Sequence, residues 1–136
     1  MLDTNVVVSA MRSPKGASAA LLMAARRGKI TLLANVALAL EYEATCMLAE
    51  HRLAAGLDVE QVGVFIDAVI AMCEPVESHF LWRPQLRDPA DELVLEAAVN
   101  GRAAAIVTFN LRDFGAAPAD FGIDLLQPSD VIRRLR

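Results

Sequence analysis

The chain has 136 residues, of which 55% are hydrophobic and only 5% aromatic, and its formal net charge is −4. This length fits one domain, spanning residues 1–136, with a core of Ala, Val, Leu and Ile. The negative net charge argues against non-specific electrostatic binding of nucleic acid. No apolar stretch reaches the roughly 20 residues that a membrane-spanning helix needs. Because the N-terminus does not read as a secretion signal, we expect a cytoplasmic protein without membrane contact.

The first half of the chain predicts two short strands and two helices. In chain order they are a β-branched strand over residues 1–10, an Ala-rich helix begun by Ser13 and Pro14 and stopped at Gly28, a strand over 30–34, and a helix over 36–56 with Asn35 as N-cap. Asp3 is the exception inside the first strand, because an aspartate is costly to bury without a partner.

The second half continues this alternation. In chain order it predicts a helix over 59–73 opened by a capping box of Asp58 and Gln61, a short strand near Val76, a helix from Asp88 to Asn100, a strand over 103–109, a loop over 110–122, and a strand over 123–127 before the closing PSDVIRRLR. Strands that alternate with helices predict an α/β fold, a three-layer α/β/α sandwich with a central parallel sheet.

In such a fold the carboxyl end of each strand and the amino end of the next helix lie at one edge of the sheet. The acidic and amide side chains that map to this edge are Asp3, Glu41, Asp88, Asp91, Glu92, Asn110 and Asp113. Clustered carboxylates raise one another's pKa unless a positive charge lies between them. A divalent cation would compensate them all, and oxygen ligands without His or Cys favour Mg²⁺ or Mn²⁺. The sequence therefore predicts a metal site.

Each acidic residue also has a purely structural interpretation. Asp88 followed by Pro89 is a good helix start without any metal. Glu41 shares its helix with Glu43, so both could belong to a solvated face, and Asp113 alone would be an ordinary loop aspartate. The convergence of separate segments on one edge is more specific than any of these residues taken singly.

The motifs in these segments resemble the PIN domain ribonucleases, especially the branch regarded as toxins of toxin–antitoxin pairs. The matching stretches, in order, are LDTNVVVSA, ALEYEATCML, LWRPQLRDPADELVLEAAVNGRAAAIVTFNLRDF and LLQPSDVI. The resemblance implies a PIN-like, Rossmann-like fold in which the first strand ends near Asp3 and NVVVSA turns toward a helix. Relatives usually have several apolar residues before LDTN, whereas this chain has Met1 and Leu2, so we expect a short first strand and a weakened placement of Asp3.

The resemblance also implies the roles of individual residues. The acidic quartet that would hold one or two Mg²⁺ or Mn²⁺ ions and act in catalysis is Asp3, Glu41, Asp91 and Asp113. Supporting polar residues that would orient ligands or metal-bound water are Asn5, Thr108 and Asn110. Asp88 becomes the helix cap or an outer helper, and Glu92 is expected to point away, toward solvent.

The implied activity is hydrolysis of RNA phosphodiester bonds by a metal-activated water, which leaves 5′-phosphate and 3′-hydroxyl ends. Candidate phosphate contacts are Arg83, Arg87 and Arg112. The implied partners are an RNA substrate, a cognate antitoxin protein and a second copy of the chain in a homodimer.

Other functional classes fit less well. A haloacid dehalogenase-type phosphotransferase needs a second aspartate two residues after the first, where this chain has Asn5. A response-regulator receiver needs an acidic pair on the first strand, a phosphoacceptor Asp on the third and a later Lys, and the chain does not have this order. The serious alternative is a PIN fold that serves as a non-catalytic RNA- or protein-binding module, although an intact acidic quartet argues against it.

Overall fold

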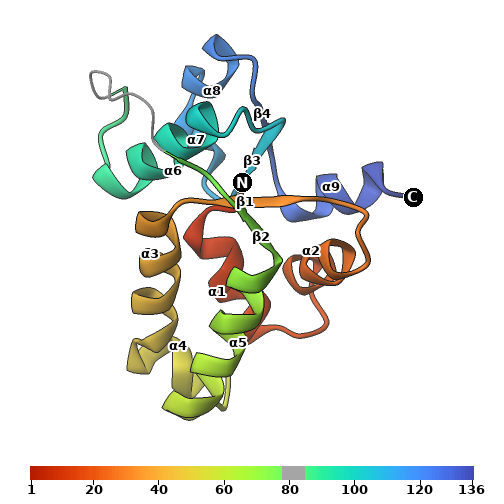
Figure 1. Ribbon diagram of the computed structural model, residues 1–136, viewed down its shortest axis with the longest axis vertical. Coiled ribbons are helices and arrows are strands. Elements are labelled where there is room, and N and C mark those ends of the chain that lie inside the picture. Colours follow the sequence, from red (N-terminus) through yellow and green to blue (C-terminus); the bar gives the residue numbers. More distant parts are fainter. Residues whose placement is uncertain (78–84) are drawn as a thin grey trace.

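The computed structural model describes residues 1–77 and 85–136 of the chain. Its helices are α1 (Thr4–Arg12), α2 (Ala17–Arg26), α3 (Val36–Met47), α4 (Ala49–Ala54), α5 (Val59–Met72), α6 (Pro89–Asn100), α7 (Leu111–Phe114), α8 (Ala117–Asp120) and α9 (Pro128–Arg134). Its strands are β1 (Leu32–Ala34), β2 (Cys73–Pro75), β3 (Ala105–Val107) and β4 (Asp124–Leu126). The chain thus has the predicted α/β composition (Figure 1).

The strands of the described residues form two parallel pairs. β1 pairs with β2, and β3 pairs with β4. The N-terminal residues extend the second pair, because Leu2 forms a parallel bridge with Val107. An apolar cavity of about 440 Å³ lies between the two pairs, lined by residues 30–33 on one side and 102–105 on the other. The predicted central sheet is therefore present only as short parallel pairs in this part of the chain.

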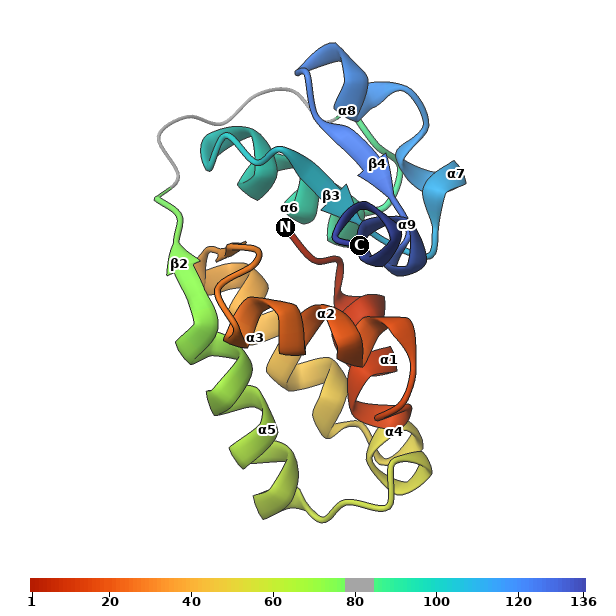
Figure 2. The ribbon, with the colours of Figure 1, turned by 90° about the vertical axis from the view of Figure 1, so that its right-hand side faces the viewer.

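Helices lie on both sides of the strands. α2 and α9 pack together on one side, and α3 contacts α6 on the opposite side (Figures 1 and 2). α1 packs between α2 and α3, and α5 covers α3 from outside. The shared core contains fully buried aliphatic side chains such as Val6, Leu38, Ile66, Leu95 and Ile106. This core fixes the N-terminal segment against β3, where the polar residues gather.

The strand predicted from local pattern over residues 1–10 is wrong beyond Asp3, where α1 begins. Asp3 is the N-cap of this helix, and its carboxylate accepts a hydrogen bond from the N–H of Thr4. Val6 and Val7 have no exposed surface, so burial outweighs the small helix penalty of β-branched residues. The expectation from the family resemblance, a helix starting near Asp3, is confirmed.

The single helix predicted over residues 36–56 is wrong as well, because it breaks at Leu48. This residue has φ −57° and ψ 135°, an extended conformation that separates α3 from α4. The turn lets α4 pack against α1 as well as α3. No Gly or Pro marks the break in the sequence, so tertiary packing decides it.

The remaining elements follow the predictions with one exception. Asn35 caps α3, and Asp58 with Gln61 forms the capping box of α5. The predicted strands are confirmed in place but are only three residues long each. The exception is the loop expected over residues 110–122, which contains α7 and α8.

Candidate functional site

Asp3 is held at the end of the N-terminal segment by both its backbone and its side chain. Its N–H donates to the carbonyl oxygen of Val107 at 2.9 Å. One carboxylate oxygen accepts from the N–H of Thr4 at 2.8 Å, and the other accepts from the hydroxyl of Thr108 at 2.7 Å. Only 7% of the residue is exposed. Asp3 is thus a partly compensated, buried acid at the start of α1, where the helix dipole favours negative charge.

Thr108 joins three of the polar residues expected to support the site. Besides donating to Asp3, its hydroxyl oxygen accepts from the N–H of Asn110 at 3.0 Å and from the side-chain amide of Asn5 at 3.4 Å. The carbonyl oxygen of that amide accepts from the N–H of Phe109 at 3.4 Å. Asn5 and Thr108 therefore lie beside Asp3, whereas Asn110 takes part through its backbone.

The start of α6 supplies the second buried acid. Asp88 is the N-cap, with its carboxylate accepting from the N–H of Ala90 at 2.8 Å, and Pro89 follows at the first helical position. The cap sets the direction of the first turn, in which Asp91 is buried with 8% exposure while Asp88 itself is exposed. Asp88 as a helix cap and Asp91 as a candidate metal ligand are therefore compatible interpretations, because the cap fixes the turn that carries Asp91.

A cavity of about 570 Å³ opens between the start of α6 and the segment that carries α7. Its lining includes Asp88, Asp91 and Asp113 together with Arg87 and Arg112. The backbone of residues 114–117 closes another side. Acidic and basic side chains from sequence-distant segments thus share one solvent-accessible space.

The aspartates interact electrostatically across this space. The pKa of Asp91 is raised from its ordinary value of 3.8 to about 6, mainly by burial and then by the negative charges of Asp3, Asp88 and Asp113. Burial also raises the pKa of Asp3, opposed by the hydrogen bonds from Thr108 and Thr4 and supported by the charges of Asp113 and Asp88. The four aspartates therefore form one electrostatic group.

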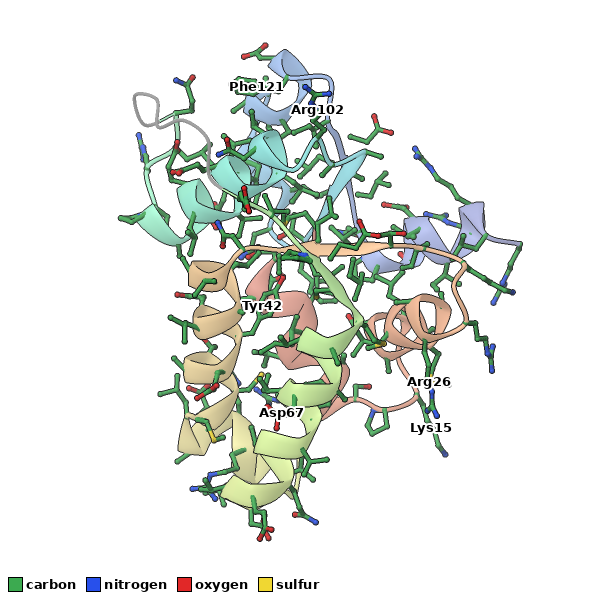
Figure 3. The ribbon with its side chains drawn as sticks, in the orientation of Figure 1. Lys15, Arg26, Tyr42, Asp67, Arg102 and Phe121 are labelled. Carbon is green, nitrogen blue, oxygen red and sulfur yellow. The ribbon has the colours of Figure 1, made fainter. Side chains whose placement is uncertain are left out.

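Glu41 stands apart from this group. It is half-buried in the second turn of α3, and it is not among the carboxylates that raise the pKa of Asp3 or Asp91. Its neighbour Tyr42 lies between α3 and α1 and donates its hydroxyl to the carbonyl oxygen of Leu2 (Figure 3). Through Tyr42, α3 is fixed to the segment that carries Asp3.

The described residues contain no set of three or more His, Cys, Asp or Glu side chains close enough to hold a metal ion. Of the predicted quartet, Asp3, Asp91 and Asp113 interact electrostatically, and Glu41 is not among the charges that shift the pKa of Asp3 or Asp91, so the quartet as a site stays a prediction. Carboxylates repel one another when no positive charge lies between them. This repulsion is consistent with carboxylates that do not approach closely enough to share a metal ion.

The structure describes two of the three predicted phosphate contacts. Arg87 and Arg112 are exposed at the cavity. Ion pairs found over residues 1–77 and 85–136 involve Arg133 with Asp130 and Arg134 with Asp124, so neither cavity arginine is neutralised there. Arg83 lies outside the described residues.

Two features of the site were not predicted. Glu92 does not simply face solvent, because its carboxylate accepts hydrogen bonds from the N–H groups of Gln85 and Leu86 and so fixes the chain that enters α6. The cavity wall formed by residues 114–117 lies in what was expected to be a plain loop. The turn at Gly115, with φ 54°, was the available sequence signal for the end of α7.

Comparison with known proteins gives the family. The sequence profile of the PIN domain matches residues 1–112, which is most of the chain and includes the segments that carry Asp3, Glu41 and Asp91. The chain belongs to the PIN domain family. PIN domains are α/β proteins and generally nucleases that usually use divalent metals. Searches of curated proteins and of solved structures found no match. The family match ends at residue 112, one residue before Asp113, which lines the cavity.

Proposed function

We propose that this PIN domain protein is a metal-dependent endoribonuclease that hydrolyses RNA phosphodiester bonds. One observation carries the proposal: burial and then the charges of three other aspartates raise the pKa of Asp91, at a cavity that also holds two arginines. Repulsion of this kind lowers stability, so its persistence at an accessible cavity is typical of a functional site. A divalent cation would relieve the repulsion.

The residue types at the site suit Mg²⁺ or Mn²⁺, and an ion would have to draw the described carboxylates closer together than they lie in the structure. Asp3, Asp91 and Asp113 offer carboxylate oxygens, and hard cations prefer such ligands. Glu41 is the fourth candidate ligand through the family resemblance. When bound, one or two such ions lower the pKa of a water molecule and stabilise negative charge on the phosphate.

The chain's own residues would position the acids and the RNA. Thr108 and the N–H of Thr4 hold the carboxylate of Asp3 in one orientation. Asn5 and Asn110 in turn fix the Thr108 hydroxyl. Arg87 and Arg112 would bind phosphate groups at the rim, which offsets the net negative charge of the protein.

RNA cleavage tests this proposal. Purified protein is incubated with single-stranded RNA and Mg²⁺ or Mn²⁺, beside EDTA and an Asp91→Asn variant. Asp67→Asn is the matched control, because Asp67 is an exposed aspartate on α5 (Figure 3). We expect cleavage by the wild type and Asp67→Asn, with 5′-phosphate products, and loss of cleavage with EDTA or Asp91→Asn. Cleavage that survives both treatments would contradict the proposal.

We further propose that the protein acts in the cytoplasm as the toxin of a type II toxin–antitoxin pair. The motif resemblance supports this role, and none of the described helices is long and apolar enough to cross a membrane. A small open reading frame beside the gene should encode an antitoxin that suppresses growth arrest on co-expression. Light scattering should give the mass of a homodimer. Normal growth of cells expressing the nuclease alone would contradict the toxin role.

A non-catalytic binding module is the remaining candidate. It would bind RNA or protein without metal-dependent cleavage. The observation in its favour is that the described residues contain no set of three acidic side chains close enough to hold a metal ion. The cleavage assay separates the two functions, because only the nuclease loses product formation on Asp91→Asn substitution.

A further inference from the structure

A separate, open groove lies beside the Thr108 network, because Asn5, which donates to Thr108, lines it. Its volume is about 490 Å³, and its lining residues are Asn5, Val8, Ser9, Arg12, Ser13 and Phe109. Asn5, Ser9 and Arg12 recur at helical spacing along α1 and form a polar stripe. This stripe extends about 10 Å from the Asp3 end of α1, at a rise of about 1.5 Å per residue.

Phe109 provides an aromatic surface at the upper end of this groove. It follows β3 directly, and 45% of the residue is exposed although its neighbour Thr108 is completely buried. Its N–H donates to the side-chain oxygen of Asn5, which also contacts Thr108. The backbone that carries the ring is thus linked through three hydrogen bonds, by way of Asn5 and Thr108, to the carboxylate of Asp3.

Arg12 provides a positive charge at the opposite end. The side chain is exposed, and one guanidinium nitrogen lies 3.1 Å from Nδ1 of His51 on α4. Where the structure describes the chain, its ion pairs do not include Arg12. The guanidinium is therefore oriented by an imidazole and keeps its charge available for an anion.

We propose that this groove binds single-stranded RNA next to the cleavage site, with Phe109 stacking on a base and Arg12 binding a backbone phosphate. The inference rests on the proposed nuclease function and assigns two residues that the acidic site does not use. Exposed aromatic rings beside cationic side chains are the usual means of holding single strands. A duplex keeps its base faces stacked, so Phe109 selects unpaired RNA.

The dimensions fit a short piece of strand. At roughly 3.4 Å or more per nucleotide, the 10 Å stripe covers at most about three nucleotides. The groove residue Asn5 is linked to Asp3 through Thr108, so a strand in the groove would lie next to one of the acids of the site. Its role is to fix the register of the RNA at the aspartates.

RNA binding without cleavage provides the test. Fluorescence anisotropy measures the affinity of a labelled 12-nucleotide oligouridylate and of a 12-base-pair RNA duplex, both in EDTA. The variants are Phe109→Leu, which removes the aromatic face but keeps an apolar side chain, Phe109→Trp, which retains it, and Arg12→Gln. Matched controls are Phe121→Leu near α8, a residue with 43% exposure, and Arg26→Gln on α2 (Figure 3). Thermal unfolding confirms that each variant is folded.

We expect Phe109→Leu to weaken oligouridylate binding about 5- to 100-fold, the range for loss of one stacked base, and Phe109→Trp to retain it. Arg12→Gln should reduce the slope of log affinity against log salt by about 0.7, the value for one phosphate contact on a single strand. The controls should bind as the wild type does, and the duplex should bind weakly.

The inference is overturned if Phe109→Leu binds like the wild type, if the controls lose as much affinity, or if the folded wild type does not bind the oligomer. These outcomes are separate from failure of the nuclease proposal. Stacking-dependent binding without cleavage in Mn²⁺ would contradict the nuclease function but support the groove. If the protein cleaves RNA but its binding does not depend on Phe109, the nuclease function is supported and the groove proposal is contradicted.

Discussion

Replacing Asp91 by asparagine should stabilise the metal-free protein at neutral and alkaline pH. The wild-type carboxyl is neutral in the folded protein up to a pKa of about 6, compared with 3.8 as its ordinary value. A pKa that is higher in the folded protein than in the unfolded chain stabilises the folded protein at low pH. This contribution is fully present below pH 3.8 and is lost as the pH rises through about 6. The asparagine has a similar volume and never ionises, so it avoids this loss.

The expected size follows from the displacement of the pKa. At about 1.4 kcal/mol for each pKa unit, a change from 3.8 to about 6 corresponds to roughly 3 kcal/mol of folding free energy. The substitution also removes the favourable interaction of the Asp91 carboxylate with the dipole of α6, which contributes up to about 1 kcal/mol. Because Asp91 lines a solvent-accessible cavity, water screens part of this energy. The net gain of Asp91→Asn at pH 8 should therefore be about 1 to 2 kcal/mol, and it should vanish near pH 4.

Urea unfolding measures this difference. Wild type, Asp91→Asn and the exposed control Asp67→Asn are compared at pH 4 and pH 8 in EDTA, followed by circular dichroism. Added Mn²⁺ should then narrow the gap at pH 8, because a ligand that binds the folded wild type stabilises it. Two results would refute this electrostatic reasoning. One is an Asp91→Asn protein that is no more stable than the wild type at pH 8, and the other is a change in the free energy of unfolding that is the same at pH 4 and pH 8.

Three further changes probe the surroundings of the site. Tyr42→Phe leaves a buried backbone carbonyl oxygen without its donor and should lower the free energy of unfolding by about 1 to 3 kcal/mol in urea titrations. Thr108→Val removes a hydrogen bond that lowers the pKa of Asp3, so carbon-detected NMR titration should find that pKa higher than in the wild type. Asp88→Asn keeps a good helix cap but removes a negative charge, so the same titration should give a lower pKa for Asp91. An unchanged stability or pKa in any of these variants would contradict the corresponding contact.

Local chemistry was enough to predict where several helices begin. Asn35, Asp58 and Asp88 were identified as N-caps because each precedes a helical apolar pattern, and each accepts a hydrogen bond from its first turn. The first ten residues show the limit of such patterns. Their β-branched side chains suit a strand, but burial against two neighbouring helices and the cap at Asp3 decide for α1. The break at Leu48 likewise depends on packing that no local signal records.

The candidate site was predictable as a group of residue types but not as a geometry. The sequence predicts Asp3, Asp91 and Asp113 at one edge of the fold, and in the structure their charges act on one another, while their role as a site stays a prediction. The hydrogen bond between Asp3 and Thr108 joins residues 105 positions apart, so only the folded chain reveals it. Glu41 was expected with the others, but it is not among the charges that shift the pKa of Asp3 or Asp91, and sequence spacing does not determine how α3 packs.

The most direct test of the central claim is the rate of RNA cleavage as a function of Mn²⁺ concentration, measured beside the Mn²⁺ binding isotherm of the same protein. We predict that the rate rises with metal occupancy, and that Asp91→Asn weakens binding and abolishes cleavage while Asp67→Asn changes neither. A wild-type protein that binds Mn²⁺ no better than Asp91→Asn, or cleaves RNA independently of occupancy, would contradict the assignment of these aspartates as a metal-dependent ribonuclease site.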